Sequence, residues 1–364
     1  MDGFVVAMFV AGLGALVFGA EMLVRHASAL SLKMGIPPLI IGLTIVAFGT
    51  GAPELAVGVY AAWVGQDDLL MGNIVGSNIA NILLVLGIGA VLAPIAVNRQ
   101  VIKLDAPVMI GASVLLFGLA KDGFLGPADG FIFVLGCTLY LVYLLQMEKT
   151  EDTLPATSPA EANQLKSSIV RHILWVCAGL ALIILGSRWL INSAVIIAAQ
   201  LGVSETFIGL TIVAVGTSLP EIATTIIACI RGERDLAIGN VVGSCTFNIL
   251  AVLGISSLIA PNGISVSHTT LSIDLPIMLI ATLGCLPLFF THHSLSRLEG
   301  GIFLGYYGLY TLYLIFHAIQ SPTAGLIGTV FWFALLPLTV IVTLIVTIQY
   351  RQQIKAGSAL EKAA

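Results

Sequence analysis

VAFGTGAPEL, at residues 46–55, interrupts a run of apolar residues that is long enough to cross a lipid bilayer. The stretch contains two glycines and a proline, and Glu54 follows the proline directly. A charged side chain at the bilayer centre costs about 2.5 to 3.5 kcal/mol or more, so an acid at that depth is a functional residue by default. The stretch therefore predicts a broken membrane helix that carries a functional carboxylate.

The composition is that of an integral membrane protein. Of the 364 residues, 58% are hydrophobic and 9% are charged, whereas soluble domains carry roughly 25% charged residues. A spanning helix needs about 20 mostly apolar residues. Eleven such windows begin near Phe4, Pro38, Leu69, Leu104, Pro127, Ile169, Thr206, Asp235, Leu271, Gly300 and Ala324. We expect the first window to be a retained helix, because it has neither a basic leader nor a small-residue cleavage site.

The basic residues predict the orientation of these spans. With the N-terminus outside, 13 of the 15 Lys and Arg residues face the cytoplasm, and only Lys121 and Arg188 face outward. Such a bias sets the topology of multi-pass proteins. The net charge of −4 and the scattered basic residues argue against a nucleic-acid partner. The bilayer is the expected surrounding, and no obligatory protein partner is indicated.

The sequence contains a long internal repeat. Residues 42–88 align with residues 209–255 at a constant offset of 167, and 27 of the 47 positions are identical. Weaker matches extend the repeat to five helices in each half. Because five is odd, the second copy enters the membrane from the opposite side, and such inverted repeats place the substrate site at their interface. The expected fold is all-α, with two inverted five-helix repeats and one extra C-terminal transmembrane helix.

The repeat also predicts the organisation of the chain into four segments. Residues 1–145 form the first repeat and residues 169–320 form the second. The polar residues 146–168 between them include two prolines and mixed charges, which is typical of a flexible cytoplasmic linker. Residues 321–364 add the extra transmembrane helix and a cytoplasmic tail.

Each repeat breaks a helix at the same place, in GTGAPE and in GTSLPE. Proline lacks an amide hydrogen and clashes with the carbonyl four residues back, so Pro53 and Pro220 should each split their helix. Unwound backbone at membrane depth is tolerated only where it is buried in protein or lines a wet cavity. Glu54 and Glu221 follow in the first turn of the second half-helix, where the positive dipole end favours a carboxylate.

These groups together predict a site for a divalent cation. The first half-helices end near Ala47 and Ala214, which adds the negative ends of two helix dipoles. Two bidentate carboxylates and two carbonyls supply six oxygens, which suits Ca²⁺ with its roughly 6 to 8 oxygen ligands. No His or Cys lies beside either signature, so zinc and copper are not favoured. The alternative is that both glutamates only cap their half-helices.

A second shared block, GNIVGSNIAN and GNVVGSCTFN, follows each broken helix. In each block a serine and an asparagine four residues apart project oxygens from one helix face. These residues are Ser77 with Asn81, and Ser244 with Asn248. The alternative role is hydrogen bonding between helices without ion contact, which we expect for Asn73 and Asn240.

The remaining polar groups fit structural roles. Asp105 and Asp274 precede prolines at helix starts and are expected to be N-caps, and Glu21 is expected to pair with Arg25 one turn away. The six histidines cluster near predicted helix ends, where solvated or interfacial side chains are expected. None lies near a matched serine or aspartate within a span, so an enzyme is disfavoured.

The doubled signatures resemble the alpha repeats of the calcium/cation antiporter superfamily, specifically its prokaryotic sodium/calcium exchangers. The resemblance covers ten of the eleven predicted helices. It implies an antiporter of the prokaryotic inner (plasma) membrane that moves Ca²⁺ against Na⁺, needs no cofactor, and works by sliding helices one and six over a fixed core. It also implies that Glu54 and Glu221 bind calcium and sodium alternately.

The same resemblance implies further ligands from backbone carbonyls and small hydroxyl residues. They are the carbonyls near Ala47, Thr50, Ala214 and Thr217, the hydroxyls of Ser77 and Ser218 at one sodium site, and the hydroxyl of Ser244 at the other. The asparagine at position 248, where potassium-carrying members have aspartate, resembles the potassium-independent type.

One position departs from the family pattern. Gly51 stands where the family usually has serine, so one sodium site loses a hydroxyl ligand. A water could replace that ligand, or H⁺ could replace Na⁺ as the driving ion in an antiporter of the same fold. Buried carboxylates that bind protons would support H⁺ coupling. A cation channel is a third hypothesis, which currents exceeding the turnover of a carrier would distinguish.

Overall fold

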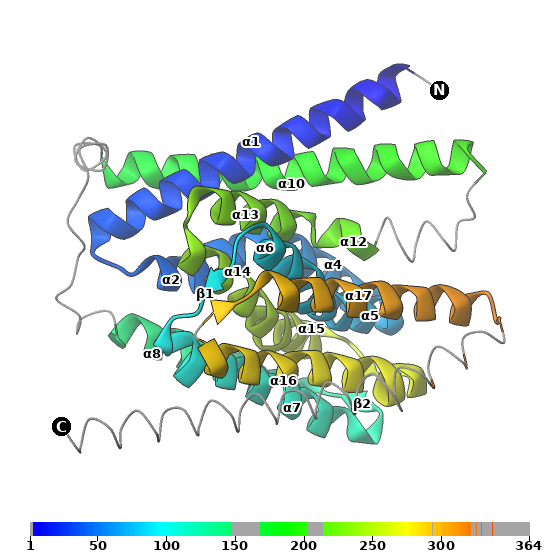
Figure 1. Ribbon diagram of the computed structural model, residues 1–364. Helices are drawn as coiled ribbons and strands as arrows, with labels where there is room; N and C mark the ends of the chain where they lie inside the picture. Colours follow the sequence, from blue (N-terminus) through cyan, green and yellow to red (C-terminus); the bar gives the residue numbers. More distant parts are fainter. Residues whose placement is uncertain are drawn as a thin grey trace.

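The computed structural model describes residues 3–147, 168–202, 214–292 and 294–321, together with three isolated positions beyond them. Over this part of the chain the structure is almost entirely helical (Figure 1). The linker predicted at 146–168 and the helix predicted from Ala324 lie almost wholly outside the described residues, as do residues 206–213 of the seventh span.

The two halves present their elements in the same order. The first contains α1 (Gly3–Met34), α2 (Pro38–Ile41), η1 (Gly42–Val46), α3 (Ala47–Thr50), α4 (Ala52–Val64), α5 (Asp67–Ile79), η2 (Ala80–Val85), α6 (Leu86–Leu92), η3 (Val101–Asp105), α7 (Ala106–Leu119), η4 (Ala120–Asp122) and α8 (Pro127–Met147). The second contains α10 (Ile169–Gln200), α12 (Ala214–Thr217), α13 (Leu219–Arg231), α14 (Arg234–Phe247), η6 (Asn248–Leu253), α15 (Gly254–Ile259), η7 (Thr270–Asp274), α16 (Leu275–His292) and α17 (Arg297–Ala318).

Both signature helices break at the predicted prolines. The segments Pro38–Thr50 and Ala52–Val64 are bent by 48° relative to each other. Gly51 has ψ of 1° and Ser218 has ψ of 6°, so both leave helical geometry between the two halves of their helices. Pro53 and Pro220 lie in the first turn of α4 and α13, where the missing amide hydrogen costs no helical bond. The split that the sequence predicts at GTGAP and GTSLP is therefore present.

Helices α1 and α10 form a layer of their own, lying together on one side of the molecule (Figure 1). Glycines allow their backbones to touch: a Cβ on Gly12 would lie 2.9 Å from the Gly186 carbonyl, and one on Gly19 would lie 2.8 Å from the Gly179 carbonyl. Gly12 and Gly179 are 167 residues apart, as are Gly19 and Gly186. The contact is thus reciprocal between the halves, as an approximate two-fold axis produces.

The centre of the molecule is formed by the span that follows each broken helix, α5–α6 in the first half and α14–α15 in the second. In the most apolar stretch of each span, 78% of the residues are buried in α5–α6 and 83% in α14–α15. The corresponding fraction is 28% in both α1 and α10. Each central segment contains a π-helical turn, η2 or η6, and such turns occur often at functional sites. The glutamate-bearing helix of each half packs against the π turn of the other: α4 against η6, and α13 against η2.

Two short antiparallel strand pairs join the halves at their loops. β1 (Ile95–Ala96) pairs with β4 (Ser294–Leu295), and β2 (Phe124–Leu125) pairs with β3 (Ile264–Ser265). In the predicted topology the first pair lies wholly on the cytoplasmic side and the second wholly on the outer side. The pairing agrees with the predicted alternation of the spans, while the absolute orientation stays a prediction.

Six of the described helices are long and apolar enough to cross a membrane, or seven when the bent pair is counted as one span. The spans predicted from Thr206, Leu271 and Gly300 correspond to α12–α13, η7–α16 and α17. These three are described only in part or are less apolar over their described length. The protein is an all-α, multi-pass integral membrane protein.

Candidate functional site

The two signature glutamates are buried in the centre of the fold. Glu54 lies in the first turn of α4 and Glu221 in the first turn of α13, and each is 1% exposed. The helix that carries each glutamate packs against the π-helical turn of the other half, α4 against η6 and α13 against η2. One oxygen of each, Oε2, has no hydrogen-bond partner among the described residues. Each half of the chain thus buries one acid in the region where the two halves pack together.

The first half-helix of the first repeat lies directly on α14. Added Cβ atoms on Gly42 and Gly239 would approach the carbonyls of Leu236 and Leu39 to 2.8 Å and 2.7 Å, respectively. Only glycine permits such close contact of helix backbones. This contact brings the end of α3 within reach of the polar side chains of α14.

A hydrogen-bond network results at this contact. The Thr50 hydroxyl donates to Asn240 Oδ1 at 3.1 Å, and Asn240 Nδ2 donates to the Thr225 hydroxyl at 3.3 Å. Thr50 also faces the Glu221 carboxylate. Asn240 therefore has the interhelical role expected from the sequence, and Asn73 is placed similarly, with Nδ2 3.4 Å from the Glu54 carbonyl.

Buried oxygens without hydrogen-bond partners occur on the helices that carry the two glutamates and on the helices packed against them. Eight buried side chains on α4, α5, α13, α14 and their flanking turns each have an oxygen without a hydrogen-bond partner among the described residues. They are Glu54, Ser77, Asn81, Ser218, Glu221, Thr224, Ser244 and Asn248. Buried polar atoms are almost always hydrogen-bonded, so such a group requires an explanation such as an ion. Seven of the eight are residues that the sequence analysis named.

The predicted carbonyl ligands lie at the ends of the first half-helices. The Ala47 carbonyl accepts from the Gly51 amide at 3.0 Å and from the Thr50 hydroxyl at 3.4 Å. Ala214 and Thr217 are the first and last residues of α12. The backbone at the first break therefore makes local hydrogen bonds in this structure, and the carbonyl contribution to a cation site stays a prediction.

Two residues of the site were missed by sequence reasoning. Thr224 occupies a position where the first repeat has Val57, so the repeat comparison carried no signal for it. Asn78 accepts a hydrogen bond from Asn248 Nδ2 at 3.2 Å. That bond fixes the Asn248 amide and leaves its Oδ1 without a partner. The only available signal for Asn78 was its place inside the GSNIAN block.

The departure at Gly51 leaves a small void. It measures about 10 Å³ and is lined by Ala47, Gly51, Asn248 and five apolar residues around them. A volume of roughly 10 to 15 Å³ is the minimum for one water molecule. A Cβ on Gly51 would lie 3.0 Å from the Ala47 carbonyl and 4.0 Å from Asn248 Oδ1. The missing hydroxyl thus falls next to an unpartnered oxygen of the opposite half.

Three expectations about the other polar residues were wrong: the N-cap role of Asp105 and Asp274, the pairing of Glu21, and the solvation of one histidine. Asp105 makes no N-cap hydrogen bond and instead accepts from the Tyr140 hydroxyl at 2.9 Å, and Asp274 accepts from Tyr310 at 3.1 Å. A tyrosine on a neighbouring helix supplies a better-placed donor than the backbone does. Glu21 forms its ion pair with Arg231 of the other half rather than with Arg25.

The third wrong expectation concerns a histidine. His172 is 3% exposed, and its Nδ1 lies 3.0 Å from Nδ1 of His26. It lies near the start of α10 but is buried against His26 of α1, so it is not solvated.

The donor set of the site consists of oxygens. Among the described residues, no group of three or more His, Cys, Asp or Glu side chains lies close enough to hold a metal ion. The candidate donors are two carboxylates, two amide oxygens and four hydroxyls. Such a set suits hard cations rather than zinc or copper. Fold and site together define a membrane transporter for cations.

Comparison with known proteins identifies the family. The family described as "Sodium/calcium exchanger protein" matches residues 4–147 and 171–316, which is most of the chain and both halves. The chain belongs to the sodium/calcium exchanger family. Members of this family are transporters, not enzymes, and the ions that they transport are Na⁺ and Ca²⁺.

Named relatives agree with this assignment. The putative antiporter CaxA of Alkalimonas amylolytica is 41% identical over 305 residues, which cover 81% of this chain and 95% of the relative. The sodium/calcium exchanger MaX1 of Methanosarcina acetivorans is 30% identical over 340 residues, covering 84% and 97% of the two chains. The inner membrane protein YrbG of Escherichia coli is 37% identical over 284 residues, covering 76% and 86%.

Solved structures of the sodium-calcium exchanger NCX_Mj share the fold. A form soaked with Na⁺ and without Ca²⁺ matches with a TM-score of 0.72 and 27% identity, over 88% of this chain and 100% of that one. A form soaked with Na⁺ and Ca²⁺ matches with a TM-score of 0.71 at the same identity. The chain is therefore similar to a sodium/calcium exchanger over almost the whole length of that protein.

Proposed function

We propose that this protein is a secondary active antiporter that exchanges Ca²⁺ for Na⁺ by alternating access around Glu54 and Glu221. The observation that carries the proposal is a group of eight buried side chains, the two glutamates among them, that have oxygens without hydrogen-bond partners among the described residues. Membership of the sodium/calcium exchanger family supports it. The proposal names both the ions and the residues that bind them.

The coordination follows from the chemistry of the donors. The two glutamates supply a charge that neutralises one Ca²⁺, and the Asn81, Asn248 and Thr224 oxygens add neutral ligands. Ser77 and Ser218 would bind Na⁺ on one flank, and Ser244 on the other, after Ca²⁺ has left. Thr50, Thr217 and the carbonyls of Ala47 and Ala214 complete the shell. No resident cofactor takes part, because the ions are the cargo.

The same pair of carboxylates explains why transport is coupled. Without a cation, two buried negative charges repel each other in a medium of low dielectric constant, where each costs several kcal/mol. Closing both sides around an unoccupied site is therefore opposed. A carrier of this type crosses the membrane loaded in each direction, as exchange requires.

The membrane arrangement is part of the proposal. Residues 1–145 and 169–320 are the two inverted repeats, 146–168 is the cytoplasmic linker, and 321–364 holds an extra transmembrane helix. The N-terminus lies outside and the protein resides in a prokaryotic inner membrane. Both strand pairs and the Glu21–Arg231 ion pair join segments that this topology places on the same side.

Flux through reconstituted vesicles tests the function. Vesicles loaded with Na⁺ and diluted into Na⁺-free medium should take up radioactive Ca²⁺, and vesicles loaded with choline should not. A shift of the external pH should have little effect on this uptake. No uptake above the choline control in either a Na⁺ or a pH gradient would reject the antiporter.

A second candidate keeps the fold but uses H⁺ as the driving ion. The void beside Gly51 favours it, because the first repeat lacks the hydroxyl that a second sodium site needs. Ca²⁺ uptake that follows a pH jump and ignores the Na⁺ gradient would select this version. Single-channel currents above the turnover of a carrier would select a channel over both.

A further inference from the structure

A large cavity extends from the candidate site toward one face of the molecule. It has a volume of about 610 Å³ and lies between α5, α12, η7 and α17. Its lining includes Ser77 and Thr217 at the inner end, Asp274 and Tyr310 in the wall, and Asp68 at the start of α5. The cavity therefore connects residues of the site with two acidic side chains that the proposed coordination does not use.

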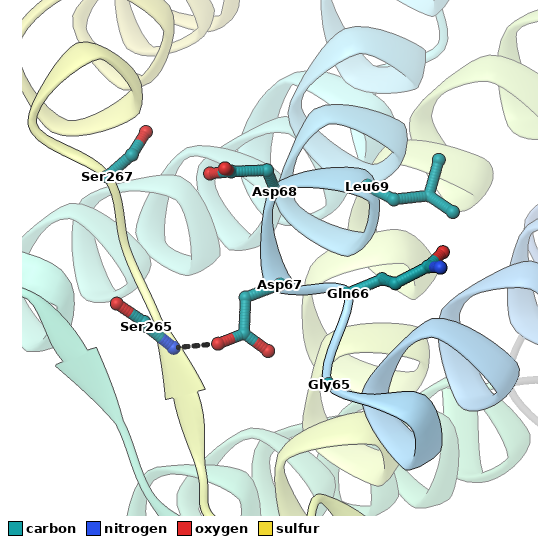
Figure 2. Close-up of a pocket in the computed structure, with 7 residues that line it drawn as sticks. All are labelled: Gly65, Gln66, Asp67, Asp68, Leu69, Ser265 and Ser267. Carbon is teal, nitrogen blue, oxygen red and sulfur yellow. Dashed lines mark hydrogen bonds between the residues drawn. The ribbon is translucent and has the colours of Figure 1, made fainter.

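Asp68 also lines a second, more open pocket of about 510 Å³ on the surface. Figure 2 shows that Asp67 and Asp68 leave the start of α5 toward the segment that carries Ser265 and Ser267. Asp67 is held there, because its Oδ2 accepts from the Ser265 amide at 2.9 Å. Asp68 is exposed and forms the boundary between the surface pocket and the inner cavity.

The inner end of the cavity points to a cation. Ser77 lines the cavity and is 3% exposed, and its hydroxyl oxygen has no hydrogen-bond partner among the described residues. Thr217 lies in the same wall. A cation that moved along this cavity would meet the two carboxylates first and the Ser77 hydroxyl last, so oxygen ligands would be available along its whole route.

The two repeats differ at the wall position. Asp274 accepts a hydrogen bond from Tyr310, and Asp105 accepts one from Tyr140, so the two Asp–Tyr pairs have the same local chemistry. Asp105 is 0% exposed, however, while Asp274 is only partly buried and lines the cavity. The hydrogen bond from Tyr310 uses one oxygen of Asp274. It does not explain why Asp274, unlike Asp105, lines a cavity.

We propose that Asp68 and Asp274 form an access path that draws cations from one face of the membrane to Ser77 and the paired glutamates. Asp68 collects the ion at the surface pocket, and Asp274 holds it halfway. The path serves Ca²⁺ and the driving monovalent cation alike, because both carboxylates act through charge. It rests on the proposed function and opens on the face predicted to be extracellular.

The expected effect concerns how readily cations reach the site. Like charges that line a cleft with walls of low dielectric constant raise the local counter-ion concentration by about 10-fold to 1,000-fold. Removing one of the two charges should lower the local cation concentration but leave the cation ligands of the proposed site unchanged. The Ca²⁺ concentration for half-maximal rate should therefore rise while the saturating rate is retained.

The test measures initial exchange rates on each face of the membrane separately, in right-side-out and inverted vesicles. Asp68→Asn and Asp274→Asn should each raise the half-saturating Ca²⁺ concentration about threefold on one face, and the double variant about tenfold. The saturating rate should stay within about twofold, and the other face should be unaffected. High concentrations of choline chloride should reduce the difference from the unaltered protein, because salt screens exposed charges.

Two controls separate charge from structure. Asp122→Asn removes an exposed acid that lines neither cavity and whose Oδ1 accepts from the Phe124 amide, so it should change nothing. Tyr310→Phe removes the hydrogen bond to Asp274 but keeps the carboxylate, so half-saturation should stay near that of the unaltered protein. If Tyr310→Phe reproduced the effect of Asp274→Asn, the acid would be structural and the path would be rejected.

The outcomes also distinguish this proposal from the proposed function. Absence of exchange by the unaltered protein rejects the function itself. Exchange by the unaltered protein with no shift in Asp68→Asn or Asp274→Asn rejects only the path. A shift that is equal on both faces would also overturn it, because a path to one face cannot alter affinity from the other.

Discussion

The regions around the two broken helices are alike in charge and unlike in hydroxyl groups. Both place a proline in the first turn of a 13-residue helix and bury the following glutamate to 1% exposure. Where the first repeat has Gly51, Val57 and Gly58, however, the second has Ser218, Thr224 and Thr225. Under the proposed function, the acids that would bind a divalent ion are duplicated, while more of the hydroxyls that would bind Na⁺ lie in the second half.

The largest expected effect on exchange comes from replacing either of the two glutamates, which are the feature that the halves share. Glu54→Gln and Glu221→Gln should each reduce Ca²⁺ exchange to the background of protein-free vesicles, because one remaining carboxylate cannot neutralise a divalent ion. Glutamine keeps the size of the side chain, so insertion and yield in detergent should be unchanged. Exchange above a tenth of the unaltered rate in both variants would contradict a role for the pair in binding.

Gly51 and Ser218 occupy matching positions, so each can be replaced by the residue of the other half. Ser218→Gly should raise the Na⁺ concentration for half-maximal exchange about threefold to tenfold, since one oxygen ligand is worth roughly 1 kcal/mol. Gly51→Ser should lower that concentration, because the new hydroxyl fits beside Asn248 Oδ1 with a small shift near the Ala47 carbonyl. Na⁺-dependent Ca²⁺ uptake measures both. If Gly51→Ser were needed before any Na⁺ dependence appeared, H⁺ coupling of the unaltered protein would be favoured.

A smaller effect is expected where an amide is positioned in one half only. Asn78→Cys gives the first repeat the residue that the second has at Cys245, and it removes the hydrogen bond to Asn248. A free Asn248 amide should raise the half-saturating Ca²⁺ concentration about twofold to tenfold. Cys245→Ala is the control at the matching position, because it keeps the Asn78–Asn248 hydrogen bond and removes only sulfur contacts, to the Asn78 carbonyl at 3.9 Å and to Asn81. Equal shifts in both variants would indicate general loosening of the packing.

The smallest expected effect compares the two Asp–Tyr pairs through stability. Tyr140→Phe leaves an acid that is 0% exposed without its donor, and should reduce the free energy of unfolding by about 1 to 3 kcal/mol. Tyr310→Phe should reduce it less, because the cavity beside Asp274 admits water. Thermal unfolding in detergent measures the two values. The reverse order would show that Asp274 is the more strongly desolvated acid.

Much of the site could be predicted from sequence because the repeat acts as an internal control. Proline followed by glutamate inside an apolar run has few physical explanations, and its recurrence at Pro220 and Glu221 removes most of them. The same reasoning fails where the halves differ. Thr224 matches a valine, so it was missed, although its hydroxyl is buried on the same helix as Glu221 and has no hydrogen-bond partner among the described residues.

Contacts between helices explain the other failures. The expectation that Glu21 pairs with Arg25, and that Asp105 caps its own helix, used partners close in sequence. The actual partners, Arg231 and Tyr140, are 210 and 35 residues away. Spacing along one helix carries no information about which neighbour will lie opposite, so only the packed structure reveals these pairs.

The strand pairs have a mechanical consequence. β1–β4 and β2–β3 tie loops of opposite halves together at both ends of the central helices, and neither pair includes α1 or α10. The α1–α10 layer is held together by its own glycine contacts. If exchange proceeds by sliding of α1 and α10 over the other helices, as the family resemblance implies, the Glu21–Arg231 ion pair between α1 and α13 must break in each cycle. Disulfides engineered between α1 or α10 and the other helices should then stop exchange, whereas disulfides within either part should not.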